Sequence, residues 1–254
     1  MQAIFDFSGI KISLSAQFDF QISPELARFE SDCQTADVYV SVRLAPEDKN
    51  TGDDTRCSIE VSGNLRCVYV PESRKNETDG ALMLRVADIY HMLLSNGAVV
   101  IHASYILYRG AAILFSAPSG TGKSTQAELW NIVTGAQIVN GDRAIIRKTD
   151  KGFVAGGIYY CGTSGICENV TAPLRAVVML GQAQENSLRR LRGRDAFTQL
   201  LRQVAYRKSP ECAAELVAQI AAGTPVYRLD CRPDANAVSL LHAELFGDEF
   251  TGGN

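Results

Sequence analysis

The sequence predicts an α/β protein in which a small β-rich region precedes a larger domain of strands and helices. Apolar and polar residues alternate strictly over residues 10–22, and this period of two is typical of half-buried strands. The same alternation recurs at 38–44, 59–61 and 68–70. Apolar residues at 82–94 are instead three or four apart, as in an amphipathic helix. A strand pattern then leads through a glycine-rich turn into a helical pattern at 111–133.

These patterns divide the chain into three segments. Residues 1–78 are expected to form a small antiparallel β-layer, because polar connectors rich in Gly, Asn and Asp separate the short strands. A single connecting helix is expected at 79–96, where Asn96-Gly97 is a typical helix C-terminus. Residues 97–250 are expected to form the larger domain. Its predicted strands lie at 99–107, 111–116, 136–140, 144–147, 176–180 and 226–230, and its predicted helices at 123–133, 195–207, 210–222 and 236–246.

Composition excludes several classes of protein. The chain has 254 residues, of which 46% are hydrophobic and 21% charged, close to globular averages of about 45–50% and about 25%. The net charge is −3 and no long basic run is present, so we expect no nucleic-acid partner. Residues 97–117 are apolar, but Arg109-Gly110 interrupts them, and we expect no membrane span. Seven scattered cysteines without a CxxC pair indicate reduced thiols and a cytoplasmic protein, with no zinc site.

The segment Ala117-Pro118-Ser119-Gly120-Thr121-Gly122-Lys123-Ser124 fits a phosphate-binding loop (P-loop), with Ala in place of the usual first Gly. Glycines let successive N–H groups turn toward phosphate oxygens, and the following helix N-terminus favours negative charge. Lys123 is then expected to contact the β- and γ-phosphates and Ser124 to contact Mg²⁺. The predicted nucleotide-binding residues are Ser119, Gly120, Thr121, Gly122, Lys123, Ser124 and Thr125. The alternative is a glycine turn that only opens a helix.

Besides the Ser124 hydroxyl, a carboxylate is needed to hold the metal ion, and it normally lies at the end of a neighbouring strand. The run Gln137-Ile138-Val139-Asn140-Gly141-Asp142 is a short apolar strand that ends in Asp142. Asp142 is therefore the predicted partner of Ser124 at Mg²⁺. The alternative is that Asp142 is a turn residue, because Asn-Gly is itself a strong hairpin signal.

Several ordered motifs together resemble the HPr kinase/phosphorylase family and its smaller relatives, which are related to phosphoenolpyruvate carboxykinase. They are His102-Ala103-Ser104, Arg109-Gly110, the segment from Ser119 to Ser124, and Val139-Asn140-Gly141-Asp142-Arg143. The resemblance covers about residues 97–246 and implies a P-loop kinase fold. It also implies an ATP- and Mg²⁺-dependent kinase that moves the γ-phosphoryl group to a hydroxyl, usually a serine of a peptide or small protein.

One position departs from the family pattern. The family has two adjacent aspartates where this chain has Gly141-Asp142, and the first aspartate usually has the general-base role. Asp142 matches the metal-binding member, so either it serves both functions, another group takes the acceptor proton, or transfer is absent. His102 matches the family histidine in its separation from Lys123. It is a candidate phosphate or acceptor contact, and the alternative is a hydrogen-bonded core histidine.

Two further segments have open interpretations. The glycine-rich stretch from Gly156 to Gly165 resembles the family's acceptor-side loop, or it is an ordinary connector. The cluster Arg189, Arg190, Arg192 and Arg194 is either a solvated surface or a charge near the transferred phosphate. Two other functions therefore stay open beside the kinase. One is a nucleotide-gated module that binds a peptide or partner without transfer, and the weaker one is a small-molecule kinase or carboxykinase.

Overall fold

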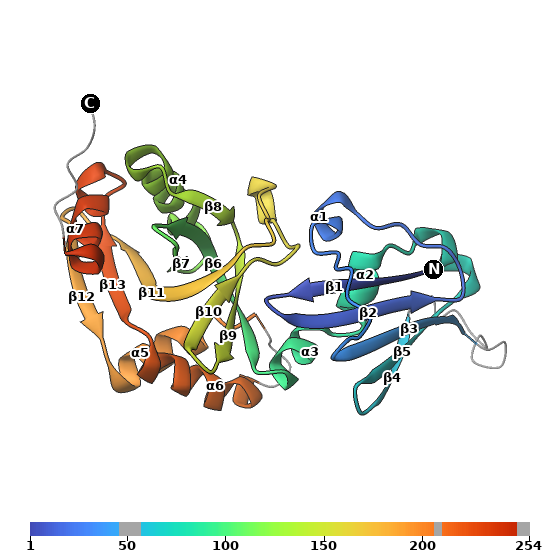
Figure 1. Ribbon diagram of the computed structural model, residues 1–254. Helices are drawn as coiled ribbons and strands as arrows, with labels where there is room; N and C mark the ends of the chain where they lie inside the picture. The colour runs from blue at the N-terminus through green and yellow to red at the C-terminus, as the bar shows by residue number, and fades with distance from the viewer. Residues whose placement is uncertain (46–56, 206–209, 248–254) are drawn as a thin grey trace. The chain divides into compact units, whose positions relative to one another are not determined.

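The computed structural model describes residues 1–45, 57–205 and 210–247. The chain divides into two compact units, Met1–Asn96 and Gly97–Asn254. Both contain strands and helices, and Figure 1 shows one sheet in each. Two short parts of the predicted larger domain, 206–209 and 248–250, lie outside the described residues.

The first unit is built on a five-stranded sheet in the order β1-β2-β3-β5-β4. Its strands are β1 (Gln2–Phe7), β2 (Ile10–Ala16), β3 (Val38–Leu44), β4 (Ser58–Ser62) and β5 (Leu65–Val70). β1 and β2 pair antiparallel, as do β4 and β5, whereas β3 is parallel to both β2 and β5. The prediction of an antiparallel layer was therefore correct for these two pairs and wrong for both pairings of β3. Side chains alternate in the same way in parallel and antiparallel strands, so the sequence pattern could not distinguish the two.

The helices of this unit are α1 (Pro24–Ala27), η2 (Glu72–Glu77), α2 (Gly80–Val86) and α3 (Ile89–Ser95). The single connecting helix predicted at 79–96 is in fact two helices. Asp88 lies between them in the left-handed region, with φ 61°. Its carboxylate accepts a hydrogen bond from the His91 backbone N–H and caps α3. The apolar spacing continued across this break, which is why periodicity alone predicted one helix.

The second unit contains an eight-stranded sheet in the order β10-β9-β6-β7-β11-β13-β12, with β8 paired to β6. The strands are β6 (Ala98–Tyr108), β7 (Ala111–Ser116), β8 (Gln137–Asn140), β9 (Arg143–Thr149), β10 (Gly152–Gly156), β11 (Thr171–Gln182), β12 (Ser187–Leu191) and β13 (Val226–Cys231). β11 is parallel to both β7 and β13. The carboxyl ends of these three strands therefore reach the same edge of the sheet.

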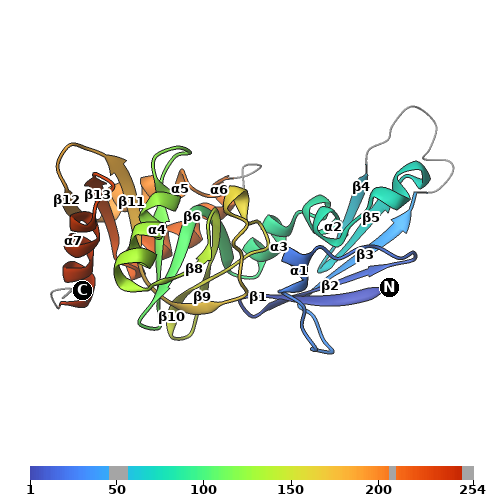
Figure 2. The same cartoon turned by 90° about the horizontal axis from the view of Figure 1, so that it is seen from above.

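Helices pack against this sheet on both sides. They are α4 (Lys123–Thr134), α5 (Gly193–Leu201), α6 (Pro210–Gly223) and α7 (Ala235–Phe246), with the short η3 (Gly162–Ser164). α4 and α7 lie on one face and α5 and α6 on the other, as Figure 2 shows from above. Trp130 of α4 and Leu241 of α7 are fully buried in one cluster with Phe115 and Val178 of the sheet. This packing holds α4 against the sheet beside β7.

Candidate functional site

The glycine-rich loop 117–122 connects β7 to α4, as the sequence predicted. Gly120 and Gly122 have φ 78° and 113°, values that favour glycine because other side chains rarely adopt them. Gly122 is the N-cap of α4 and offers no side-chain cap. The first N–H groups of a helix have no partner within the helix. The loop and the first turn of α4 therefore present backbone donors and the positive end of the helix dipole to an anion.

A cavity of about 280 Å³ lies against this loop, and we call it the phosphate-side cavity. Its lining residues are Ser119, Gly120, Gly122, Lys123, Ser124, Thr125, Gly141, Asp142 and Thr163. All the predicted nucleotide and metal residues except Thr121 thus meet around one space. Thr163, from the segment 156–165 whose role the sequence left open, faces the same cavity.

Lys123 is half-buried at the base of the loop. Its Nζ donates a hydrogen bond to the Ala117 carbonyl at 3.2 Å. Burial lowers the pKa of the Lys123 amine, and the negative charge of Asp142 acts in the opposite direction. Lys123 and Asp142 are therefore close enough to interact electrostatically across the cavity.

Asp142 follows β8 in a bend and not in a hairpin turn. β8 and β9 both pair antiparallel with β6, one after the other. The hairpin suggested by Asn-Gly therefore does not form, whereas the choice between a metal ligand and a structural residue of the bend stays open for Asp142. The Asp142 carboxylate forms an ion pair with Arg143, with Oδ2 and Nε 3.3 Å apart, and the Arg143 guanidinium lies 4.6 Å from the ring centre of Tyr160.

Asn140 shapes this bend, and the sequence analysis gave it no role of its own. The residue is fully buried. Its Oδ1 accepts hydrogen bonds from the backbone N–H groups of Asp142 and Arg143, both at 2.9 Å. Its Nδ2 donates to the Ile158 carbonyl at 2.7 Å and the Tyr160 carbonyl at 3.1 Å. One amide thus ties the backbone of Asp142 to the segment after β10.

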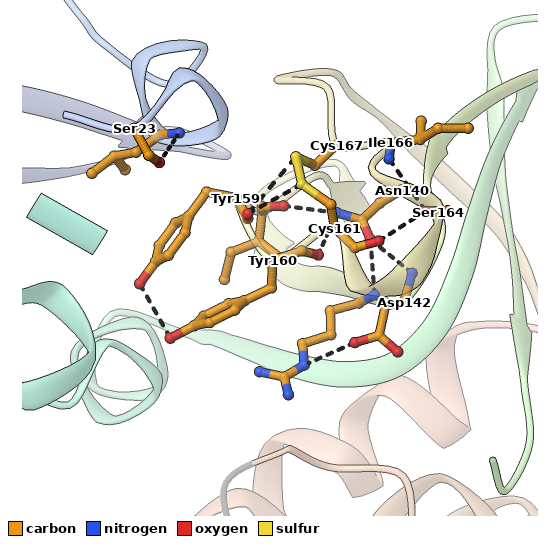
Figure 3. The surroundings of a disulfide bond; sticks show 12 residues. Ser23, Asn140, Asp142, Tyr159, Tyr160, Cys161, Ser164, Ile166 and Cys167 are labelled. Atoms are coloured by element: carbon orange, nitrogen blue, oxygen red, sulfur yellow. Dashed lines mark hydrogen bonds and ion pairs between the residues drawn. A yellow bond between two sulfur atoms is a disulfide. The ribbon is translucent and has the colours of Figure 1, made fainter. Parts of the chain in front are cut away.

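The loop 160–167 lies over the bend and contains a disulfide bond between Cys161 and Cys167. Figure 3 shows this bond beside Asn140, Asp142 and Ser164. A Cβ on Gly162 would lie only 2.6 Å from the Asp142 Cβ, so the loop backbone passes close to that side chain. The expectation that all the cysteines are reduced thiols was wrong for this pair. A turn of η3 brings their Cα atoms to 5.0 Å, which sequence spacing alone does not reveal.

His102 lies on β6, paired in register with Arg143 of β9. Its backbone N–H donates to the Gln203 carbonyl at 2.8 Å, and its carbonyl accepts a hydrogen bond from the Ser116 hydroxyl at 2.6 Å. It is half-buried and does not line the phosphate-side cavity. Its role in phosphate or acceptor contact stays a prediction. The four arginines near Arg190 are all exposed, as expected of a solvated surface.

Mg²⁺ fits the donor set of the cavity. The Ser124 hydroxyl and the Asp142 carboxylate are oxygen ligands, and Mg²⁺ keeps several waters, so it needs few protein ligands. Among the described residues no group of three or more His, Cys, Asp or Glu side chains is arranged to hold a metal ion. Within the same residues, no helix is long and apolar enough to cross a membrane.

Comparisons with known proteins find similarity among solved structures only. No family model matches the chain, and no curated protein matches it. Among solved structures, the HPr(Ser) kinase/phosphatase of Coxiella burnetii is similar over 57% of this chain and 87% of its own, with 12% identity and a TM-score of 0.36. We therefore infer function from the geometry of the site alone.

Proposed function

We propose that the protein is an ATP- and Mg²⁺-dependent kinase that transfers the γ-phosphoryl group to a hydroxyl of a peptide or small protein. One observation carries the proposal. The glycine-rich loop, Lys123, Ser124 and Asp142 line the same cavity at the start of α4. This is the set of groups that phosphoryl transfer requires, because catalysis there is mostly positioning and neutralisation of charge.

Each residue has a distinct part in this proposal. The N–H groups of the loop and of α4 bind phosphate oxygens, while the Lys123 ammonium neutralises the β- and γ-phosphates. Ser124 and Asp142 would hold Mg²⁺, which when bound neutralises charge on the β- and γ-oxygens. The Asn140 amide keeps Asp142 in place through the backbone. During transfer the acceptor oxygen bonds to the γ-phosphorus, the bond to the leaving oxygen breaks, and the hydroxyl proton passes to water, because residue 141 has no side chain to accept it.

A second candidate function follows from Gly141. A base at this position would need a side chain, but the space beside Gly141 is filled by Ser164. Loss of a general base slows turnover by about 10²–10⁴-fold. A nucleotide-gated binding module without useful transfer is therefore the alternative to an active kinase.

Nucleotide-dependent stabilisation tests the first step of the proposal. ATP with Mg²⁺ should raise the thermal midpoint, because a ligand that binds only the folded state stabilises it by about 2.7 kcal/mol at a hundredfold excess over Kd. Lys123→Ala should remove most of the shift. Lys151→Ala, at an exposed turn after β9, is the matched control and should keep it. No shift with any nucleoside triphosphate in the unmodified protein would contradict the proposal.

Transfer itself needs a separate assay. Labelled ATP should transfer its γ-phosphate to a hydroxyl-containing peptide or small protein in a screen of candidate acceptors. Transfer would support the kinase. Nucleotide binding without transfer to any acceptor or to water would favour the nucleotide-gated module.

A further inference from the structure

A second cavity adjoins the glycine-rich loop on the side of β11 and β13. It measures about 430 Å³, within the range of about 300–1,000 Å³ that is usual for small-molecule sites. Gly122, Thr125 and Gln126 line it from the loop and α4. Gln182, Ala183 and Arg232 line it from the ends of β11 and β13 and the residues that follow. We call it the strand-end cavity.

The topology of the sheet places this cavity where α/β proteins bind ligands. β7, β11 and β13 are parallel neighbours, and Gln182 pairs with Cys231 at the ends of β11 and β13. In open α/β sheets, ligands bind in the crevice outside the carboxyl ends of such strands. The strand-end cavity lies at that edge.

The two cavities share part of their walls. Gly120, Gly122 and Thr125 line both the phosphate-side cavity and the strand-end cavity. Asp142 and Thr163 belong only to the first, whereas Gln182 and Arg232 belong only to the second. An elongated ligand can therefore cross the glycine-rich loop from one cavity to the other.

Gln126 gives the strand-end cavity a polar group that lacks a partner. The residue is only 2% exposed, and its Nε2 has no hydrogen-bond partner among the described residues. Buried amide donors are almost always paired in folded proteins. A ligand that offers an acceptor to Gln126 would satisfy this donor, and ring nitrogens, ring carbonyls and ribose oxygens are all suitable.

The opposite rim is held by a set of hydrogen bonds. The Arg232 backbone N–H donates to Asn186 Oδ1 at 2.8 Å, and Asn186 Nδ2 donates to Asp234 Oδ1 at 2.8 Å. The Arg232 guanidinium in turn pairs with Asp234 Oδ2, at 3.2 Å from Nε and 3.1 Å from Nη2. This orients a planar guanidinium at the cavity rim, and guanidinium planes stack on aromatic rings.

We infer that the strand-end cavity binds the base and ribose of the nucleotide, so that its phosphates cross Gly122 and Thr125 toward Lys123 and Asp142. The inference rests on the proposed function, because it assumes that the phosphate-side cavity holds the phosphates. This assignment also sets the orientation of the bound nucleotide between the two cavities. The terminal phosphate lies beside Asp142 and Thr163, and the nucleoside lies over the ends of β11 and β13.

Comparison of ATP with inorganic tripolyphosphate tests this assignment by titration calorimetry with Mg²⁺. ATP should bind at least tenfold more tightly than tripolyphosphate. Ala183→Trp should fill the strand-end cavity and remove that advantage, while tripolyphosphate binding stays unchanged. Ala222→Trp, at an exposed alanine of α6, is the control and should bind both ligands as the unmodified protein does.

A second variant tests the role of Gln126. Gln126→Leu should weaken ATP binding without weakening tripolyphosphate binding, and it should not lower the thermal midpoint, because the amide donor has no protein partner to lose. A lower midpoint with unchanged ATP affinity would overturn this role. Equal affinity of the unmodified protein for ATP and tripolyphosphate would overturn the nucleoside site but leave the phosphate site standing. Failure of both ligands to bind would overturn the proposed function as well.

Discussion

The side chain of Ser164 occupies the space beside Gly141 where any other residue would place its Cβ. That Cβ would lie 2.7 Å from the Ser164 Cβ and closer still to its Oγ. Gly141 itself has no left-handed φ, so a close contact, and not backbone conformation, explains the glycine. Ser164 is held there by its hydroxyl, which donates to the Cys161 carbonyl at 2.8 Å and accepts from the Ile166 N–H at 3.2 Å.

This contact predicts how an aspartate at position 141 would behave. Gly141→Asp alone should destabilise the protein by about 1–3 kcal/mol, as overpacking does, measured by urea unfolding. Gly141→Asp combined with Ser164→Gly should recover much of that loss, because the second change vacates the space. If the missing base limits transfer, the double variant should also turn over faster than Ser164→Gly alone. Equal stability of the two Gly141→Asp proteins would contradict the predicted contact.

Substitution of Asp142 tests whether its carboxylate holds Mg²⁺ or whether the residue has only a structural role. Asp142→Asn should weaken Mg²⁺-dependent ATP binding by an order of magnitude or more, because a charged oxygen ligand is lost. Asn140 holds the backbone of residue 142 and not its carboxylate, and the carboxylate's ion pair with Arg143 is partly exposed. Partly exposed ion pairs contribute little to stability, so the thermal midpoint of the free protein should change little. Asp150→Asn, at an exposed turn, serves as the control in both measurements. Unchanged Mg²⁺ dependence in Asp142→Asn would remove Asp142 from the metal site.

Reduction of the Cys161–Cys167 bond should loosen the loop that lies over Asp142. In the chain-entropy model, so short a covalent loop stabilises the folded protein by about 2 kcal/mol because it restricts the unfolded chain, so reduction should lower the thermal midpoint. At a temperature where the protein stays folded, we expect Cys161→Ser with Cys167→Ser also to weaken Mg²⁺-ATP binding, because loop 160–167 lies over Asp142. Cys212→Ser, at an exposed free cysteine, should change neither. Equal ATP affinity before and after reduction would show that the bond does not support the site.

The pH dependence of ATP binding should follow Lys123. Burial lowers the pKa of this amine below its ordinary value, and phosphate binds the protonated form. Nucleotide affinity should therefore fall as the pH rises through the lowered pKa, and binding should take up protons in that range. Arginine stays charged throughout this range, so Lys123→Arg should lose the pH dependence even if it binds more weakly. The same slope in both proteins would assign the titration to another group.

The local parts of the site could be predicted from sequence, whereas the contacts over long chain separations could not. The apolar run before Pro118 and the glycines before Lys123 define β7, the loop and α4 within a few residues of their observed bounds. Alternation placed strands correctly at β3 and β5 but could not assign their parallel pairing. No local pattern indicates that Ser164 packs on Gly141, that Cys161 pairs with Cys167, or that Gln126 faces a cavity.

The hydrogen bonds of Asn140 also affect how readily its side-chain amide is lost by deamidation. Asn followed by Gly is the sequence in which an unfolded chain most readily loses its side-chain amide, and asparagine is a thermolabile residue. In the folded protein the Asn140 amide is buried and both of its ends are engaged. Conversion to aspartate would turn the donor toward the Ile158 and Tyr160 carbonyls into an acceptor. Folding thus protects the Asn140 side chain from amide loss, and damage there would reach Asp142 through its own backbone.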